Sequence, residues 1–454
     1  MKKLFFTAVY AIYTVSLPAL AQQAPLRLRL PEALEIAVKQ QPDFNNAERN
    51  IAFARSLTRS SKAAYLPRIT AESDIRYNVI IPTSVLPANA FNPSGDPKEL
   101  IPIRFGTPWN NSMGLRMTQP LYDPVKISTM NGSLLGEKQA EVRQRRLKAD
   151  RYEDLARAWY GLMLERARSE YKRKEIESNL ANETLIRDLL KEGRALEIDH
   201  QEANIRTRSS KLDLEKSSYD ILSLQANISY LMGYDTLVLI EPVETFENLM
   251  RDPTNELIGE FGMTTSNGVV RTDLEEEKIL EQIDEIELAR KKAEKLPVVN
   301  FEGYLGGNNF SYGFRPFQNW YGNSFLGLSL RWPIFSGGEK RHQIEQAQIR
   351  LEQQKNNVKR VKQQIDYDIL KSENDLRHLK SLWEVQNERI KLEKERTGLI
   401  KTRLMENRAT GKDLVDAETS VAREVDALCR IEHDYLLARL ALQKASGSLF
   451  QLKQ

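Results

Sequence analysis

Two pairs of carboxylates, at corresponding places in the chain, are the residues best suited to chemistry. Asp413 and Asp416 are spaced i, i+3, and Asp199 and Glu202 repeat that spacing in the first half of the chain. The spacing places both acids of a pair on one helix face, where they attract cations and repel anions. The alternative is structural: Asp413 caps the start of a helix and Asp416 lies on a solvated face.

No pattern typical of an enzyme accompanies these acids. The glycine-rich segment 303–307 lies inside an expected strand and precedes no helix, so it is not a nucleotide-binding loop. Ser336, followed by Gly337 and Gly338, fits a passage from strand to helix better than a nucleophile elbow. The four histidines lack the spacing of metal ligands: His200, His342, His378 and His433. We therefore expect no catalysis, no cofactor and no bound metal.

The chain of 454 residues contains one unit twice. Residues 43–67 align without a gap onto residues 273–297, and Asp199 recurs as Asp413. The stretch between the strand-like segments and the acids has almost the same length in both halves, which matters when two helices must end at one level. Self-similarity on this scale predicts a duplicated architecture rather than several unrelated domains.

The N-terminus indicates export. Residues 1–21 have the pattern of a signal peptide, with Lys2 and Lys3 before an apolar stretch and Ala19-Leu20-Ala21 at its end. Cys429 is the single cysteine, so we expect neither a disulfide framework nor an N-terminal lipid anchor. The formal net charge of +3 does not indicate a nucleic-acid partner. After the expected signal peptide the chain has no run of 18 apolar residues, so no membrane-spanning helix is predicted.

Two proline-free stretches, 125–241 and 334–454, predict long helices because proline breaks a helix interior. Each is interrupted once, at 192–195 and at 406–411, where Gly193 and Asn407 suit the left-handed geometry that ends a helix. We therefore expect two antiparallel helical hairpins with these turns at their tips.

Apolar residues within both hairpins recur at heptad-like steps, which predicts narrow coiled-coil seams. In the first hairpin the expected seam is Ile198, Ile205, Leu212, Tyr219, Leu222 and Ala226. In the second it is Ile365, Ile369, Leu376, Leu379, Trp383 and Ile390. Such narrow stripes cannot close a globular core alone, so each hairpin must pack against its repeat partner and against other copies of the chain.

Four segments alternate apolar and polar residues and predict strands with one wet face and one apolar face. They lie at about 67–82, 109–123, 297–311 and 319–333. Each is long enough to cross a bilayer when tilted, and aromatic residues gather near their ends, as at a membrane interface. The alternative is the edge of a soluble sandwich. The loop 82–108, rich in Pro, Asn and Gly, suits an exposed hairpin tip.

These motifs together resemble the TolC-like outer-membrane efflux and secretion channels, the outer membrane factors. The resemblance covers the whole mature chain and is carried by the order, duplication and spacing of several short motifs. They are Leu30-Pro31-Glu32-Ala33-Leu34, Gln41-Pro42-Asp43, Ala64-Tyr65-Leu66-Pro67, Gln119-Pro120-Leu121-Tyr122 and Trp332-Pro333-Ile334-Phe335-Ser336-Gly337-Gly338.

The resemblance implies a mainly α-helical fold with a membrane β-barrel, in which a strand–strand–long helical hairpin unit is duplicated. Three copies would form one barrel of twelve strands, continued by an α-helical barrel. The implied divisions are the signal peptide, a first repeat, an equatorial linker and a second repeat: 1–21, 22–233 with its hairpin at 124–233, 234–270, and 271–454 with its hairpin at 337–450.

The same resemblance implies a passive conduit in the outer membrane of a Gram-negative bacterium, with a long periplasmic extension. Its expected partners are two further copies of the chain, outer-membrane lipid, a periplasmic adaptor (membrane fusion protein) that opens the channel, and an inner-membrane pump that drives efflux or type I secretion. A periplasmic coiled-coil scaffold or adaptor with soluble strands is the alternative. An exported enzyme is the third interpretation.

Site residues follow from motif positions in the family. Asp413 and Asp416 fall where similar channels have acids lining the periplasmic constriction, and three copies would make each a ring of carboxylates. Asp199 and Glu202 are the equivalents in the first repeat. Adaptor contact or a latch is expected at the tips, at Gly193, Arg194, Ala195, Asn407, Arg408 and Ala409. Arg194 and Arg408 either latch the closed tip or shield the turn, and the gating arginine of some members aligns with Ala409.

Overall fold

The computed structural model describes residues 25–90, 93, 96–250, 271–406 and 408–448. The expected signal peptide and Asn407 lie outside these residues, as does the linker beyond Met250. The chain forms two compact units. Unit 1 takes the described parts of Met1–Phe44, Lys148–Asn267 and Asp368–Gln454, and unit 2 those of Asn45–Leu147 and Gly268–Tyr367. Both repeats contribute to both units.

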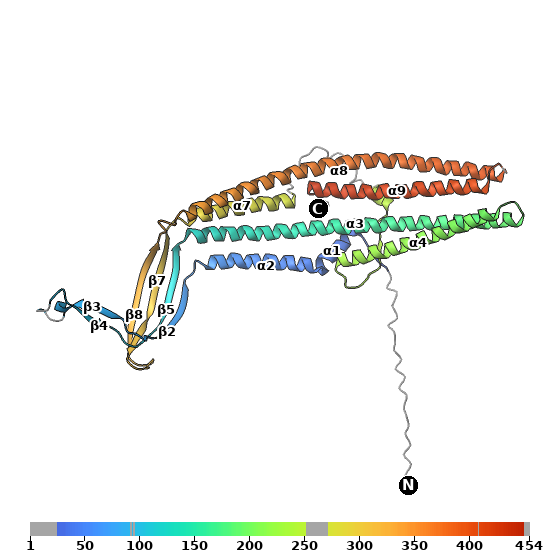
Figure 1. Cartoon of the computed structure of the whole chain (residues 1–454). Coiled ribbons are helices and arrows are strands. Elements are labelled where there is room, and N and C mark those ends of the chain that lie inside the picture. The colour runs from blue at the N-terminus through green and yellow to red at the C-terminus, as the bar shows by residue number, and fades with distance from the viewer. Residues whose placement is uncertain (1–24, 91–92, 94–95, 251–270, 407, 449–454) are drawn as a thin grey trace, which may run out of the picture. The chain divides into compact units, whose positions relative to one another are not determined.

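Unit 2 contains a four-stranded antiparallel sheet with the strand order β2-β5-β7-β8 (Figure 1). The strands are β2 (Arg68–Tyr77), β5 (Trp109–Tyr122), β7 (Val298–Ser311) and β8 (Trp320–Arg331). The pairing of β5 with β7 joins the first repeat to the second, and its only irregularity is a shift between Pro120 and Tyr122. Because every neighbouring pair is antiparallel, β2 and β8 run in opposite directions at the two edges.

The sheet has one apolar and one polar face. Ala71, Leu115 and Leu305 lie opposite one another across β2, β5 and β7, whereas the next row holds Thr70, Arg116 and Tyr304. On the polar face the Arg116 Nε donates to both Glu72 carboxylate oxygens at 3.0 Å, and its guanidinium lies 5.4 Å from the centre of the Tyr304 ring. The alternation expected from the sequence is thus present in the strand register.

A second, smaller hairpin lies in the chain between β2 and β5, in the segment expected to be the loop of an exposed hairpin tip. Its strands β3 (Thr83–Pro87) and β4 (Leu100–Arg104) pair antiparallel, with Val85 opposite Pro102 and Leu86 opposite Ile101. The short helix η1 (Ala88–Ala90) follows β3. The connection between β7 and β8 is much shorter, so the two repeats differ in length at this point.

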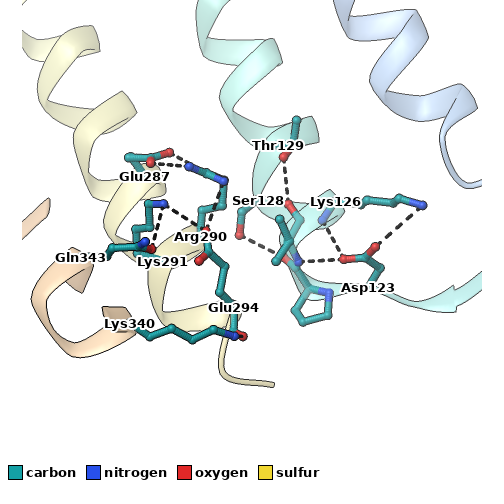
Figure 2. Close-up of polar contacts among 12 residues, drawn as sticks. Asp123, Lys126, Ser128, Thr129, Glu287, Arg290, Lys291, Glu294, Lys340 and Gln343 are labelled. Atoms are coloured by element: carbon teal, nitrogen blue, oxygen red, sulfur yellow. Dashed lines mark hydrogen bonds and ion pairs between the residues drawn. The ribbon is translucent and has the colours of Figure 1, made fainter. Parts of the chain in front are cut away.

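Polar contacts hold the helix ends of unit 2 that adjoin the sheet (Figure 2). The backbone N–H groups of Val125 and Lys126 donate to Asp123 Oδ1 at 3.1 Å, which caps the start of α3 (Pro124–Lys191). In the second repeat Lys340, in α8 (Glu339–Met405), donates to the backbone carbonyl of Glu294, at the end of α7 (Thr272–Ala293). These contacts supply partners for backbone groups that helix ends leave free.

Helices α2 (Pro42–Ala63) and α7 lie beside the parts of α3 and α8 that belong to unit 2. Arg55 of α2 makes ion pairs of 3.0 Å with two glutamates of α3. Between α3 and α7, Arg143 and Arg146 hold Glu276 at 2.7 and 3.0 Å. Charged pairs, rather than a broad apolar face, therefore connect these helices.

Unit 1 contains most of the hydrophobic core. Strands β1 (Leu26–Leu28) and β6 (Ile240–Pro242) pair in parallel, and helices α1 (Leu30–Gln40) and α5 (Phe246–Met250) lie in the same unit. The long helices α4 (Glu197–Met232) and α9 (Gly411–Ser446) pair with α3 and α8. The largest fully buried side chains gather here: Trp159, Leu155, Leu162, Ile228, Met232 and Leu436.

Hydrogen bonds place the four long helices of unit 1 in the order α4, α3, α9, α8. Asn179 of α3 donates to the Ser210 hydroxyl of α4 at 2.7 Å. Arg168 of α3 donates to Asp426 of α9 at 2.6 Å. Gln386 of α8 donates to Glu424 of α9 at 2.7 Å. Helices α4 and α8 therefore form the two outer positions of this row.

Within one chain the expected seam of the second hairpin is buried or half-buried, whereas the apolar stripe expected in the first hairpin is exposed. Ile390 and Leu376 of α8 are buried, and the other expected members there are half-buried. In α4, Ile205 and Leu212 are 67% and 65% exposed, and Ile198, Tyr219 and Leu222 are also exposed. The side of α4 that meets α3 instead carries small and polar residues: Ala203, Thr207, Ser210, Ser217 and Gln225. These side chains allow close helix approach and bond across the seam.

The expected fold class is confirmed: each repeat consists of two strands followed by a long helical hairpin. The repeated units are β2-β5-α3-α4 and β7-β8-α8-α9. Across the part of the chain that the structure describes, no helix has the length and apolar composition needed to cross a bilayer.

Candidate functional site at the hairpin tips

The two hairpin tips share a long backward hydrogen bond at equivalent arginines. Gly193 has φ +72°, and the Arg194 N–H reaches back to the Leu189 carbonyl at 2.8 Å. In the second repeat the Arg408 N–H bonds the Arg403 carbonyl at the same distance. The bond at Arg194 is the long backward bond of a helix end closed by a left-handed residue, which explains the glycine at position 193.

Both tip arginines pair within their own turn. Arg194 Nη1 lies 3.4 Å from Glu192 Oε2, and Arg408 Nη1 lies 3.3 Å from Glu406 Oε2. The arginine side chains are 71% and 78% exposed. Exposed pairs of this kind are held weakly, by about 0–1 kcal/mol, so both guanidinium groups are available to another partner.

Asp413 closes the start of α9. The Thr410 N–H donates to Asp413 Oδ2 at 2.8 Å, the Thr410 hydroxyl donates to the same oxygen at 2.7 Å, and the Asp413 N–H donates to the hydroxyl at 3.2 Å. The backbone and side-chain hydrogen bonds from Thr410 hold the pKa of Asp413 below its ordinary value. This is the capping role that was the alternative to a pore-lining acid.

Asp199 plays the corresponding part at the start of α4. The Leu196 N–H donates to Asp199 Oδ2 at 3.0 Å. Leu196 has no hydroxyl to return a bond, so only half of the reciprocal arrangement is present. The two repeats thus share the capping acid but differ in the residue it caps.

The second acid of each pair lies on the open side of its helix. Asp416 and Glu202 are both exposed, as are Asp413 and Asp199. Asp413 and Asp416 therefore lie on one face of α9. They differ in their contacts, because the Asp413 carboxylate is hydrogen-bonded to Thr410 in the turn. Sequence reasoning did not identify Thr410, Glu192 or Glu406, although Thr410 and Asp413 have the spacing of a helix-capping pair.

Gly411 marks a close approach of the two hairpins near the tips. A methyl group at this glycine would lie 2.6 Å from Cδ2 of Leu185 in α3. Ala195 and Ala409 are the small residues of the two turns, and both are half-buried. Small side chains at these positions keep the tips slender.

Comparisons with known proteins concern the family and the fold of the chain. The family model described as outer membrane efflux protein matches residues 283–448. No curated protein sequence matches the chain at a significant level. The expected resemblance to outer-membrane efflux channels is thus confirmed for the second repeat by the family pattern.

Solved structures extend the likeness of fold to nearly the whole chain. The outer membrane protein VceC of Vibrio cholerae is 14% identical, with a TM-score of 0.71 over 92% of this chain and 96% of its own. The Campylobacter jejuni CmeC outer membrane channel is 14% identical, with a TM-score of 0.71 over 94% and 87%. The open state of the Neisseria gonorrhoeae MtrE outer membrane channel is 14% identical, with a TM-score of 0.72 over 92% and 89%.

Proposed function

We propose that three copies of this chain close into a passive conduit through the outer membrane of a Gram-negative bacterium. The observation that carries the proposal is the pair of open edges of the sheet. Among the described residues, β2 pairs only with β5 and β8 pairs only with β7. Open edges of such length attract further strands. Because β2 and β8 run in opposite directions, β8 of one copy can continue antiparallel into β2 of the next, and three copies give twelve strands.

The two faces of the sheet support a membrane location. A closed barrel leaves no backbone group without a hydrogen bond in lipid. The face with Leu115 and Leu305 would point toward lipid, and the face with Glu72 and Arg116 would line the channel. Strands β5 and β7 are each 14 residues long, and about 9–11 tilted residues cross the bilayer core.

The outer helices of unit 1 support the same assembly. Ile198, Ile205, Leu212 and Tyr219 form an exposed stripe at seven-residue intervals along α4. On α8, Leu392 and Leu399 are exposed at the same interval. Heptad spacing is the pattern of helices that pack along one another. The α4 stripe of one copy would cover the α8 stripe of its neighbour.

The hairpin tips would carry the contacts with partners and the gate of the channel. A periplasmic adaptor would contact the tips at Gly193, Arg194 and Ala195 and at Asn407, Arg408 and Ala409, and an inner-membrane pump would drive efflux or type I secretion. Asp413, Asp416, Asp199 and Glu202 would form the acidic ring or rings at the periplasmic constriction. The exposed tip arginines and the exposed Asp416 support these roles.

A fractionation experiment separates the conduit from a periplasmic scaffold. The full chain is expressed with its signal, and membranes are washed with salt and then extracted with detergent. We expect release by detergent only, a trimer in the extract, and single-channel current in planar bilayers. Release by salt, or a stable monomer without affinity for detergent, would exclude the conduit.

One substitution with a matched control tests whether the exposed stripe of α4 contributes to assembly. Ile205→Glu places a charge within the α4 stripe and should reduce the trimer fraction. Lys211→Glu introduces the same side chain at an exposed position outside the stripe and should leave the trimer intact. Equal behaviour of the two variants would contradict a role for the stripe in assembly.

A further inference from the structure

A pocket of about 560 Å³ lies within unit 1, away from the tips. Its walls come from α1, α3 and α9 and from the segment around α5. The volume is in the range of small-molecule sites, about 300–1,000 Å³. Its apolar lining is formed mainly by these residues: Leu30, Leu34, Val38, Leu249, Leu436 and Leu440.

The floor of this pocket is the hydrophobic core itself. Trp159 is 0% exposed, and Leu34 and Leu436 are also buried. All three belong to the main core cluster of the unit. A floor made of packed core residues is held in place before any ligand arrives, which reduces the ordering cost of binding.

Two polar atoms of the lining have no hydrogen-bond partner within the described residues. They are the indole Nε1 of Trp159, a donor, and Oε2 of Glu244, an acceptor. The other oxygen of Glu244 accepts from the Leu30 N–H at 3.1 Å, which fixes the carboxylate. Buried polar atoms are almost always satisfied. A bound molecule with one acceptor and one donor would satisfy both.

The charged groups around the pocket favour an anion. The bases Lys39, Lys148 and Arg439 outnumber the acids Glu35 and Glu244. Arg439, Glu244, Tyr152 and Tyr160 all line this pocket. Burial raises the pKa of both tyrosines, and their protonated hydroxyls remain hydrogen-bond donors.

We infer that this pocket binds a small amphipathic organic anion, with an apolar body, one anionic head group and one N–H or O–H donor. The body lies against Leu34, Leu436 and the Trp159 ring. The head group accepts from Trp159 Nε1 beside Arg439, and the donor reaches Glu244 Oε2. This site does not depend on the conduit proposed above, because its lining residues all lie within unit 1.

The probe is 8-anilinonaphthalene-1-sulfonate, which combines a sulfonate, an N–H donor and an aromatic body. It is titrated by fluorescence against the purified full chain, with the same solution without protein subtracted. Trp159→Phe keeps most of the shape and removes the donor. Loss of a hydrogen bond to a charged group should weaken binding by roughly 10- to 150-fold. Arg439→Gln should weaken it and reduce its dependence on salt.

A filled pocket provides the second test. Val38→Trp places a bulky ring in the pocket lining and should abolish the saturable signal. Gln40→Trp adds the same ring to α1 at an exposed position outside the pocket and should not change binding. Thermal unfolding verifies that each variant is folded. An unchanged dissociation constant in Trp159→Phe and Val38→Trp, with both folded, would overturn the inference.

Discussion

Thr410 and Asp413 hold each other at the start of α9. The carboxylate accepts from both the backbone and the hydroxyl of Thr410, at 2.8 and 2.7 Å, and the Asp413 N–H returns a bond to the hydroxyl at 3.2 Å. This reciprocal arrangement satisfies backbone donors that a helix start otherwise leaves free. It also fixes the position of an acid expected to act in the channel.

Thr410→Ala is predicted to loosen the tip of the second hairpin. Loss of an N-terminal capping hydroxyl costs about 1 kcal/mol, and the effect should be confined to the first turn of α9. Amide hydrogen exchange there should accelerate about fivefold. Thr402→Ala is the matched control, because its hydroxyl bonds the Gly398 carbonyl inside α8 and caps no helix start. Equal acceleration in both variants would contradict the capping role.

The same cap predicts a pH dependence at this tip. Hydrogen bonds from Thr410 keep the pKa of Asp413 below its ordinary value, so its contribution is complete above the unfolded pKa of about 3.9. It is lost as the pH falls through the lower folded pKa. The protection factor of the first turn of α9, which compares its exchange rate with that of an unfolded chain at the same pH, should therefore stay constant down to about pH 4 and fall below it. Asp413→Asn should remove this fall.

Asp413 and Asp416 are predicted to contribute unequally to cation block of single-channel current. The Asp413 carboxylate is bonded to the turn, whereas Asp416 is exposed one helical turn later. Asp416→Ala should therefore reduce block by a divalent cation more than Asp413→Ala does, and the double variant should change it most. Unchanged block in the double variant would remove both acids from the constriction.

How far the sequence predicts the helical seams depends on which residues line them. Apolar periodicity identifies the seam of α8 because Leu376 and Ile390 are both apolar and buried. In α4 the inward side carries Thr207 and Ser217, so hydrophobic spacing selects the opposite face. The small and polar residues on the inward side of α4 could have indicated the side that packs against α3. Apolar periodicity is the stronger pattern in the sequence, and it points to the other side of the helix.

In the strands and the tips, too, the sequence predicts some features and not others. Alternation predicts the four long strands because each has one apolar and one polar face. It does not predict β3 and β4, where Pro87 and Pro102 lie within short strands and proline usually argues against them. The sequence indicates the capping alternative for Asp413, whereas the ion pairs of the tip arginines depend on rotamers that no pattern specifies.

Ser217→Leu is predicted to destabilise the first hairpin, although it adds an apolar residue. Ser217 is fully buried between α4 and α3, and its hydroxyl donates to Glu165 Oε2 at 3.2 Å. A larger side chain there overpacks the seam and removes that bond, at a cost of about 1–3 kcal/mol. The neighbouring Ser218 is exposed, so Ser218→Leu should leave thermal unfolding nearly unchanged. A higher melting temperature in Ser217→Leu would show that the seam is wrongly assigned.

Glu276 predicts a second, separate pH dependence in unit 2. Burial raises the pKa of Glu276, but hydrogen bonds and charge from Arg143 and Arg146 outweigh it, so the pKa lies below its ordinary value. The contribution to stability is complete above the unfolded pKa of about 4.3 and is lost as the pH falls through the folded pKa. Glu276→Gln removes the charge that pairs with both arginines, so it should lower the free energy of unfolding at neutral pH by about 1–2 kcal/mol. The effect is limited to this size because both arginine side chains are half exposed and solvent screens the pairs.

The difference between Glu276→Gln and the unaltered chain should shrink as the pH is lowered, because protonation removes the same charge that the substitution removes. Chemical unfolding followed from about pH 7 to about pH 3 measures this convergence. Glu285→Gln, at an exposed position on the same helix, should track the unaltered chain throughout. A difference that persists at the acid end of this range would mean that Glu276 acts through packing rather than through its ion pairs with α3.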